Sequence, residues 1–481
     1  MKIIVVGIGK IGYTIAKVLS EKRNVHVTVI DNNANVIDNV SEQIDARFLL
    51  GNGASEKILI EAGARDADLI ISTTNADELN ILCCIMAERM GTKHSVARVR
   101  NPEYMLEFNN LWKDLGIDVI INPEGQTARE ISRILRYPST EKIDTFLGGR
   151  VEMVSIKVSD TPGYFIGKSV SDVFKRDMGI LLPVVERENE AFIPNGDFVF
   201  KESDIIKILG RPSRIMKFLI QIKKRPKKSQ EVMVVGGGKI TRYLVELLNR
   251  HMNKPVIKII EKDLAKCEAL FDSLSADSLD SRCLFIHGDG TNEELLTAEE
   301  IDNMDAFICL TDRDEENVFI SLYALHRGVK NVITKVNHLH QNMAKDLGLE
   351  KIITPQNITA NTVARYVDGL IGALGSNIKT IHNIFSGKNE NVEAIEFQVN
   401  EKSRCLDIPL KNIKLKEGIL IGCISRGSEI IIPTGETEMH IGDSVIIISK
   451  NNNIHNLDDI LSNRIDIILD IIKNEQGDNA K

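Results

Sequence analysis

The 481-residue sequence is short of several features that would assign it to a class at once. No run of apolar residues approaches the eighteen or so that a membrane-spanning helix needs, so we expect no segment to cross a bilayer. The seven cysteines are odd in number and include no C-x-x-C pair, which favours reduced thiols in a cytoplasm. The first residues follow a strand pattern without a charged and then apolar leader, so we expect no secretion signal.

Positive charge and catalytic motifs are also scarce. The 60 Lys and Arg residues face 68 Asp and Glu residues, and this net charge of −8 argues against a nucleic-acid partner. Motifs such as G-x-S-x-G and H-E-x-x-H are absent. The segment 163–169 resembles a P-loop but has one residue too few between its glycines, so a helix cap is the better interpretation. His338 and His340 have no further ligand nearby, and we interpret them as surface histidines.

The most informative stretch that is present lies at the start of the chain. An apolar run at residues 3–6 predicts a buried strand, and a helical pattern follows from residue 13. Between them Gly7, Gly9 and Gly12 have the G-x-G-x-x-G spacing. The first glycine permits a tight turn, the second lets backbone amides approach a phosphate, and the third lets the helix pack on the strand. This turn, with Ile8, Lys10 and Ile11, therefore predicts a pyrophosphate site at a helix N-terminus.

A second apolar run, residues 25–30, ends in Asp31, about twenty residues after the glycines. A carboxylate there accepts hydrogen bonds from a ribose and repels a 2′-phosphate. Strand and helix patterns then alternate, which predicts a doubly wound parallel sheet with its site at the carboxyl ends of the strands. The candidate residues at those ends are Asn52, Thr73, Thr74, Arg98 and Arg100.

The whole pattern then recurs, so we interpret the chain as a tandem duplication. In each copy a Rossmann-like domain precedes a small α+β domain, and the fold class is α/β. The expected boundaries are 1–138 and 139–222 for the first pair, 223–229 for a basic linker, 230–376 and 377–460 for the second pair, and 461–481 for a C-terminal helix and polar tail.

The second copy departs from the first at the positions that matter for a nucleotide. Thr241 replaces the third glycine, and we expect its side chain to push the helix off the strand and to crowd the phosphate pocket. Asn337 and Gln356 replace a charged Arg100 and Glu124. Two interpretations stay open: a second site with another ligand preference, or a scaffold. The candidate residues of this second site are Gly236, Gly238, Lys239, Glu261, Asp289, Thr311 and Lys335.

Two charged groups of the first half carry more specific hypotheses. Lys10 and Arg98 are expected to bind a terminal phosphate, although both could be solvated surface charges. Glu124 follows a strand-ending proline and is a candidate ligand of a divalent cation or part of a dimer contact. A helix-capping carboxylate explains it equally well.

The sequence resembles the TrkA family of regulatory subunits of bacterial and archaeal Trk potassium uptake systems. The resemblance covers nearly the whole chain and rests on five stretches, namely 7–12, 51–53, 71–74, 97–104 and 121–124. It implies RCK (also called KTN) nucleotide-binding domains and RCK C-terminal domains, binding of NAD(H) and of ATP or ADP, and self-association as a dimer or tetramer in a ring. It also implies an integral membrane potassium-translocating partner of the Trk type, which would hold the chain at the cytoplasmic face of the membrane.

An NAD-dependent oxidoreductase is the alternative function. Such an enzyme needs a substrate domain with an acid or base near the nicotinamide. Each module that follows a nucleotide domain here is under about a hundred residues, a size below that of most domains, and it lacks a concentrated His, Lys or Tyr set. We therefore expect a regulatory protein and not an enzyme.

Overall fold

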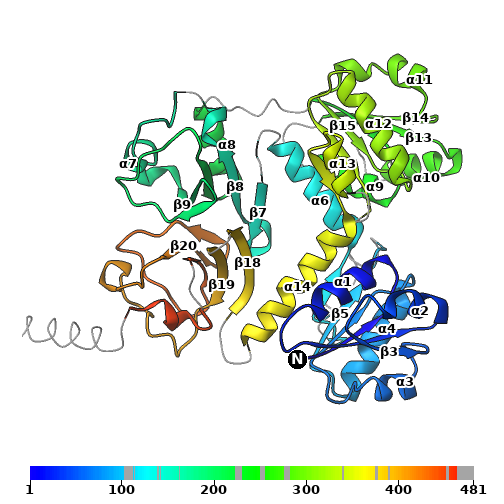
Figure 1. Ribbon diagram of the computed structural model, residues 1–481, viewed down its shortest axis with the longest axis horizontal. Coiled ribbons are helices and arrows are strands. Elements are labelled where there is room, and N and C mark those ends of the chain that lie inside the picture. Colours follow the sequence, from blue (N-terminus) through cyan, green and yellow to red (C-terminus); the bar gives the residue numbers. More distant parts are fainter. Residues whose placement is uncertain are drawn as a thin grey trace, which may run out of the picture. The chain divides into compact units, whose positions relative to one another are not determined.

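The described residues of the computed structural model form four sheets, and helices surround the two parallel ones (Figure 1). The structure describes all residues except 102–103, 105–111, 113, 138–139, 141, 162, 223–229, 250–254, 276–281, 338–340, 374–377, 388–389, 451–453 and 463–481. The expected basic linker, His338 and His340, and nearly all of the expected C-terminal tail lie outside the described residues. The sequence pattern also predicts a helix over residues 103–115, and most of these residues lie outside the described ones.

The first domain is a six-stranded parallel sheet with the order β3-β2-β1-β4-β5-β6. Its strands are β1 (Lys2–Val6), β2 (His26–Asp31), β3 (Arg47–Leu50), β4 (Leu69–Ser72), β5 (His94–Arg98) and β6 (Val119–Ile121). Its helices are α1 (Lys10–Ser20), α2 (Ala34–Ser41), α3 (Glu56–Glu61) and α4 (Asp77–Met90), followed by α6 (Pro123–Arg136). The order changes direction between β1 and β4, where a doubly wound sheet forms a crevice for ligands.

The second half repeats this sheet with the order β14-β13-β12-β15-β16-β17, again parallel throughout. Its strands are β12 (Glu231–Val235), β13 (Val256–Glu261), β14 (Cys283–His287), β15 (Ala306–Cys309), β16 (Val332–Lys335) and β17 (Lys351–Ile353). Its helices are α9 (Lys239–Asn249), α10 (Leu264–Ser275), α11 (Glu293–Ala298), α12 (Asp314–His326), α13 (Gln341–Asp346) and α14 (Pro355–Ala373). The predicted duplication of the Rossmann-like domain is confirmed.

A helix of the first half completes a hydrophobic core of the second Rossmann-like domain. Helix α6 belongs to the first half in sequence, but its apolar face packs against α9 and the second sheet. Ala128, Ile131 and Leu135 lie in one buried cluster with Val232 and Leu244 of the second half. Figure 1 shows α6, in cyan, beside the green helices of the second domain. Residues 1–136 and 228–364 accordingly form one compact unit.

The two small modules also repeat each other. The first has the antiparallel order β10-β9-β11-β8-β7 and the second has the matching order β21-β20-β22-β19-β18. The first contains β7 (Lys142–Phe146), β8 (Val151–Lys157), α7 (Val170–Val173), β9 (Ile180–Arg187), β10 (Glu190–Phe192), β11 (Ile205–Gly210) and α8 (Pro212–Gln221). The second contains β18 (Ile378–Ser386), β19 (Asn391–Gln398), β20 (Ile419–Arg426), β21 (Glu429–Ile431) and β22 (Ser444–Lys450).

These two modules form a second compact unit, residues 137–227 and 365–481, in which their sheets pack on each other. One buried cluster joins Val151 and Met153 of the first module to Val392 and Ile446 of the second. The ammonium group of Lys207, 3% exposed, donates a hydrogen bond across this interface to the Ile384 carbonyl oxygen at 2.9 Å. None of the described helices is both long and apolar enough to span a membrane.

Candidate nucleotide sites

Each parallel sheet has a glycine turn after its first strand. Gly7 has a φ of +86° and Gly236 a φ of +104°, which only glycine adopts without strain. A Cβ on Gly7 would also lie within 2.9–3.1 Å of the Thr73–Thr74 backbone. By contrast, the space beside Gly9 and Gly238 is open, with no heavy atom within 4 Å of a built Cβ. The second glycine of each turn therefore leaves a backbone surface that a phosphate can approach.

An acidic residue at the end of the second strand is fixed by the turn itself. Asp31 accepts hydrogen bonds from the backbone amides of Ile8 (2.8 Å) and Asn33 (2.9 Å). Glu261 accepts the equivalent bonds from Gly237 (2.6 Å) and Asp263 (2.9 Å). Both carboxylates therefore lie beside the turn at the place where a Rossmann-type site holds an adenosine ribose.

The third position of the turn differs between the halves, and Thr241, which we expected to crowd the phosphate pocket, lines the large cavity. A Cβ on Gly12 would lie 1.9 Å from the Gly7 carbonyl oxygen, so the first half requires glycine. Thr241 is nevertheless fully buried, and its hydroxyl donates a hydrogen bond to the Gly236 carbonyl oxygen at 2.5 Å. The second turn keeps its entry bond, from Gly236 N to Ile260 O at 2.9 Å. The threonine is thus accommodated by a hydrogen bond and does not disrupt the turn.

A buried asparagine organises the next strand end in each half. Asn80 Oδ1 accepts from the amide (2.7 Å) and hydroxyl (2.7 Å) of Thr74, and its Nδ2 donates to the Arg98 carbonyl oxygen at 2.9 Å. Asn317 repeats these bonds with Thr311 and with the Lys335 carbonyl oxygen. Asn80 thus holds the ends of β4 and β5 together, and Asn317 holds the ends of β15 and β16 together. Asn80 and Asn317 occupy equivalent positions in the two halves, but nothing in the sequence marked them as structural supports of the site.

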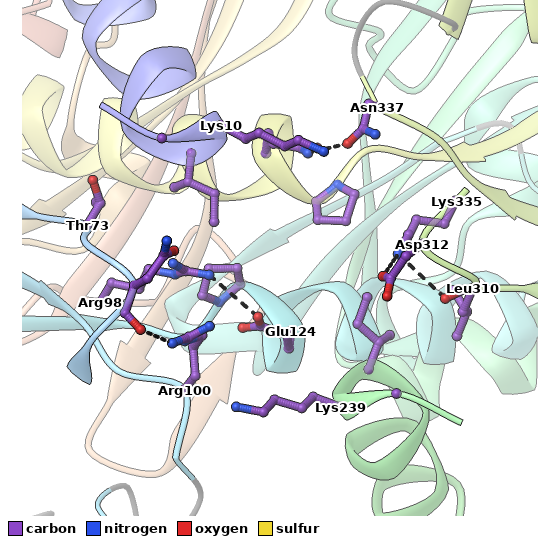
Figure 2. Close-up of a pocket in the computed structure, with 18 of the residues that line it drawn as sticks. Lys10, Thr73, Arg98, Arg100, Glu124, Lys239, Leu310, Asp312, Lys335 and Asn337 are labelled. Atoms are coloured by element: carbon purple, nitrogen blue, oxygen red, sulfur yellow. Dashed lines mark hydrogen bonds and ion pairs between the residues drawn. The ribbon is translucent and has the colours of Figure 1, made fainter. Parts of the chain in front are cut away.

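The two glycine turns border one cavity of about 800 Å³ between the Rossmann-like domains (Figure 2). Figure 2 shows side chains from both halves directed into it, with Lys10 pointing toward Asn337 and Lys239 toward Arg100. Its charged lining consists of Lys10, Arg98, Arg100, Lys239 and Lys335 against Glu124 and Asp312. The excess of cations makes this cavity suitable for phosphate groups.

The two arginines of the cavity are held in different ways. Arg98 is 8% exposed, donates to the Thr74 carbonyl oxygen at 3.3 Å and faces Glu124 at 3.6 Å. Burial lowers the pKa of Arg98, and the charge of Glu124 opposes that shift. Arg100 is fixed by Asp77, which accepts its backbone amide at 2.7 Å and its Nε at 3.3 Å. Asp77 is a supporting residue that the sequence analysis missed.

A second cavity, of about 470 Å³, lies beside Glu261 at the carboxyl end of β13. Gly236, Gly238, Glu261, Asp289 and Thr311 all line it. Lys262 also lines it and donates to Asp289 at 2.6 Å, an ion pair that lowers the Asp289 pKa to about 2. The first half has the uncharged Asn32 and Asn52 at the corresponding strand ends, so the two halves differ in charge at this place.

Most of the sequence-predicted site residues therefore meet at these strand ends. The large cavity is lined by Gly9, Lys10, Ile11, Thr73, Arg98, Arg100, Glu124, Gly238, Lys239 and Lys335. Neither cavity is lined by Gly7, Ile8, Gly12, Asp31, Asn52 and Thr74. Asn52 instead accepts the Ala54 amide at 2.9 Å and shapes its own turn. Within the described part of the chain no group of three or more His, Cys, Asp or Glu side chains could hold a metal ion, and Glu124 faces Arg98.

Solved structures share this architecture. The crystal structure of the GsuK RCK domain superposes with a TM-score of 0.59 at 18% identity, covering 93% of this chain and 92% of that one. The GsuK channel bound to NAD gives a TM-score of 0.61 at 18% identity, with 93% and 76% of the two chains covered. At this identity the likeness establishes the fold.

Sequence comparison establishes the family. The TrkA-N domain family matches residues 3–123 and 232–355, and the TrkA-C domain family matches residues 153–221 and 394–462. The Trk system potassium uptake protein TrkA homolog 1 of Methanosarcina mazei is 31% identical over 457 residues, which cover 93% of this chain and 97% of that protein. The Trk system potassium uptake protein TrkA of Halomonas elongata is 29% identical over 460 residues, covering 93% and 95%. The chain belongs to the TrkA family, with its TrkA-N and TrkA-C domains present twice in tandem.

Proposed function

We propose that this protein is a nucleotide-sensing regulatory subunit that gates a membrane potassium uptake protein of the Trk type. The observation that carries the proposal is the shared cavity of a TrkA-family chain, in which two phosphate-binding turns and five cationic side chains face one space. The named relatives are Trk system potassium uptake proteins. A ligand in such a cavity contacts both domains at once. Its binding therefore stabilises the domain arrangement in which all of these contacts form.

The proposed ligands are NAD(H) and ATP or ADP. The fixed Asp31 carboxylate is suited to an adenosine ribose, and the open backbone at Gly9 to a diphosphate. Beyond the diphosphate, Lys10 and Arg98 bind the terminal phosphate of ATP. Arg98 supports this role because its buried Nε has no hydrogen-bond partner among the described atoms. The GsuK channel, which has the same fold, was solved bound to NAD.

Gating requires that nucleotides bind two states of the assembly with different affinities, since tight binding to both states shifts nothing. We propose that the chain self-associates as a dimer or tetramer into a ring of RCK domains. The ring lies at the cytoplasmic face of the membrane through its potassium-translocating partner. Nucleotide exchange in the shared cavity then changes the shape of the ring and the opening of that partner.

The first half is proposed to be the principal sensor. It has Arg98, Arg100 and Glu124 where the second half has Lys335, Asn337 and Gln356. Loss of a charge-assisted phosphate contact costs roughly 1.5–3 kcal/mol, or about tenfold to a hundredfold in affinity. Glu261 and Asp289 still suit a ribose, so the second site favours a mononucleotide.

Calorimetry on the full-length chain tests the phosphate assignment. The halves cannot be separated for this purpose, because α6 of the first half completes the core of the second. Lys10→Ala and Arg98→Ala should each weaken ATP binding about tenfold or more while ADP binding changes less. Lys17→Ala, at an exposed position of the same helix α1, is the matched control. Unchanged ATP affinity in both site variants would remove these residues from the proposed site.

We propose no catalytic role for the chain. The described residues that line the large cavity include no histidine, tyrosine or cysteine to act beside a nicotinamide. Incubation with NADH and a panel of carbonyl substrates tests the oxidoreductase alternative, and turnover at enzyme-like rates would overturn the regulatory proposal.

A divalent cation is the remaining proposed ligand. Glu124 Oε2 is buried without a hydrogen-bond partner among the described atoms, as expected of an oxygen that a ligand completes. One carboxylate is too few for Mg²⁺ or Ca²⁺, so the other ligands must come from the phosphates and water.

A further inference from the structure

One side chain of the second half bonds to the first half's end of the large cavity. Tyr243 lies on α9, one helical turn after Lys239 of the second glycine turn. Its half-buried hydroxyl donates a hydrogen bond to the Arg100 carbonyl oxygen at 3.0 Å. The phenol oxygen of Tyr243 in turn accepts a hydrogen bond from Asn122 Nδ2 at 2.8 Å. One phenol thus ties the second half to two strand ends of the first.

Both hydrogen-bond partners of Tyr243, Arg100 and Asn122, lie at the proposed phosphate site. Asn122 precedes α6, and its Oδ1 accepts the Gly125 amide at 2.7 Å, which fixes the first turn of the helix that bears Glu124. Arg100 lines the cavity directly, and Asp77 holds its backbone amide from the other side. The phenol therefore bonds to the backbone at Arg100 and to the cap residue beside Glu124. Burial raises the pKa of Tyr243, so the hydroxyl keeps the proton that it donates.

The first half donates no equivalent hydrogen bond to the second half at the positions that match Tyr243 and Asn122. The repeat places Thr14 of α1 opposite Tyr243, and the Thr14 hydroxyl bonds to the Lys10 carbonyl oxygen within its own helix at 2.9 Å. Thr354 corresponds to Asn122, and its buried hydroxyl has no partner among the described atoms. Among these matched positions, only the second half supports the site of the first.

We infer that Tyr243 is a positioning residue for the terminal-phosphate end of the first nucleotide site, supplied by the second half of the chain. The inference rests on the proposed nucleotide-binding function. Tyr243 touches no ligand and acts by holding Arg100 and the α6 cap where a third phosphate reaches them. Removing the hydroxyl should therefore lower affinity for ATP and leave affinity for ADP nearly unchanged, because ADP ends before this part of the cavity.

The test is calorimetry of ATP and ADP binding to the full-length chain and its Tyr243→Phe variant, which keeps the ring and loses the hydroxyl. We expect ATP affinity to fall about 3- to 10-fold, the range of one lost hydrogen bond, and ADP affinity to change less than about twofold. Thr14→Val at the matched position of α1 is the control and should leave both affinities unchanged. Equal loss for ATP and ADP would indicate a merely structural role and overturn the inference.

A double-variant cycle separates positioning from general destabilisation. In an Arg100→Ala background, Tyr243→Phe should cause a smaller loss of ATP affinity than in the unaltered protein, because one of the two groups that it positions is gone and only the α6 cap remains. Fully additive losses would contradict the inference. If the unaltered protein binds ATP and ADP equally, the proposed phosphate site fails first. If it prefers ATP and Tyr243→Phe keeps that preference, only the role of Tyr243 fails.

Discussion

Arg98 and Glu124 face each other in the large cavity with their nearest atoms 3.6 Å apart, which is too long for a good hydrogen bond. Arg98 Nε and Glu124 Oε2 are both buried and without a hydrogen-bond partner among the described atoms. The two charges therefore compensate each other only in part, and each retains the capacity to bind a ligand atom. A phosphate would bind Arg98, and a cation bound to that phosphate would bind the carboxylate of Glu124.

This geometry predicts the effect of Glu124→Gln. Without divalent cations the variant should bind ATP several-fold more tightly than the unaltered protein, because a negative charge beside the terminal phosphate is gone. With Mg²⁺ present the order should reverse, because a neutral side-chain amide is a poorer cation ligand than the carboxylate that it replaces. Calorimetry with ATP in EDTA and in Mg²⁺ measures both. The same affinity shift in the two buffers would contradict a cation role for Glu124.

The two glycine turns each satisfy one carbonyl oxygen, but with a hydroxyl from a different position. Thr73 donates to the Gly7 carbonyl oxygen at 2.9 Å, whereas Thr241 donates to that of Gly236, and Leu310 occupies the position equivalent to Thr73. Thr241→Gly should destabilise the second half by about 1–3 kcal/mol, because it leaves a buried carbonyl unpaired and adds a glycine to a helix.

Adding Leu310→Thr to Thr241→Gly should restore part of that loss, because it recreates the arrangement of the first half. Urea unfolding of the two single variants and the double variant measures the coupling. A double variant that is less stable than either single variant would show that the two positions do not exchange roles. The reciprocal Gly12→Thr should prevent the first turn from folding, because its Cβ would lie 1.9 Å from the Gly7 carbonyl oxygen.

The sequence predicted the fold well because the fold depends on local patterns. Buried strands such as Ile3–Val6 form continuous apolar runs, and the glycine spacing requires a strand, a turn and a helix in that order. Because the sequence is a tandem repeat, each of these patterns occurs twice and supports the same interpretation twice. The sequence did not predict that α6 packs into the core of the second half, because an amphipathic helix does not reveal which surface it covers.

The site was predictable by position and not by contact. Lys10 and Arg98 were expected to lie at one crevice of the first half and Lys335 at the equivalent place in the second half, and all three line the large cavity. The sequence did not predict that the two glycine turns border the same cavity, because this depends on how the two domains pack. Supporting residues were missed for the same reason: Asp77 and Tyr243 act through backbone groups far away in sequence.

Two ion pairs with buried carboxylates in the small modules predict a large stability effect. Arg187 donates two hydrogen bonds to the buried Asp204, at 2.6 and 2.8 Å, and Arg426 does the same to Asp443 at 3.0 and 2.9 Å. Asp204→Ala should destabilise the modules by about 3–5 kcal/mol, because it leaves a charged partner uncompensated. Asp443→Ala should cost less, because the Arg426 side chain is 38% exposed against 16% for Arg187. Equal denaturation midpoints for both variants and the unaltered chain would contradict this.

The final prediction concerns pH and rests on His382 of β18. Its ring is 8% exposed and packs against Phe146 of the first module, with the ring centroids 4.5 Å apart. Burial lowers the pKa of His382 to about 3, and the positive charges of Arg365 and Lys142 add to the shift. In the unfolded chain the pKa returns to about 6.5. Between these values the unfolded chain binds a proton that the folded chain does not, so stability falls as the pH decreases below about 6.5, by up to about 1.4 kcal/mol per pH unit.

Other buried groups in the same module change stability in the opposite direction. Burial raises the pKa of Glu393 and Glu396, so these carboxyl groups favour the folded state as the pH falls. The contribution of His382 is therefore isolated by comparison with His382→Gln, which cannot take up the proton. Thermal unfolding between about pH 7.5 and 5.5, a range that spans the unfolded-state pKa, should show a smaller loss of Tm in the variant than in the unaltered chain. His26→Gln, which replaces an exposed histidine on β2, should keep the original loss. If His382→Gln loses as much Tm as the unaltered protein over this range, His382 takes up no proton on unfolding and its burial does not set the pH dependence.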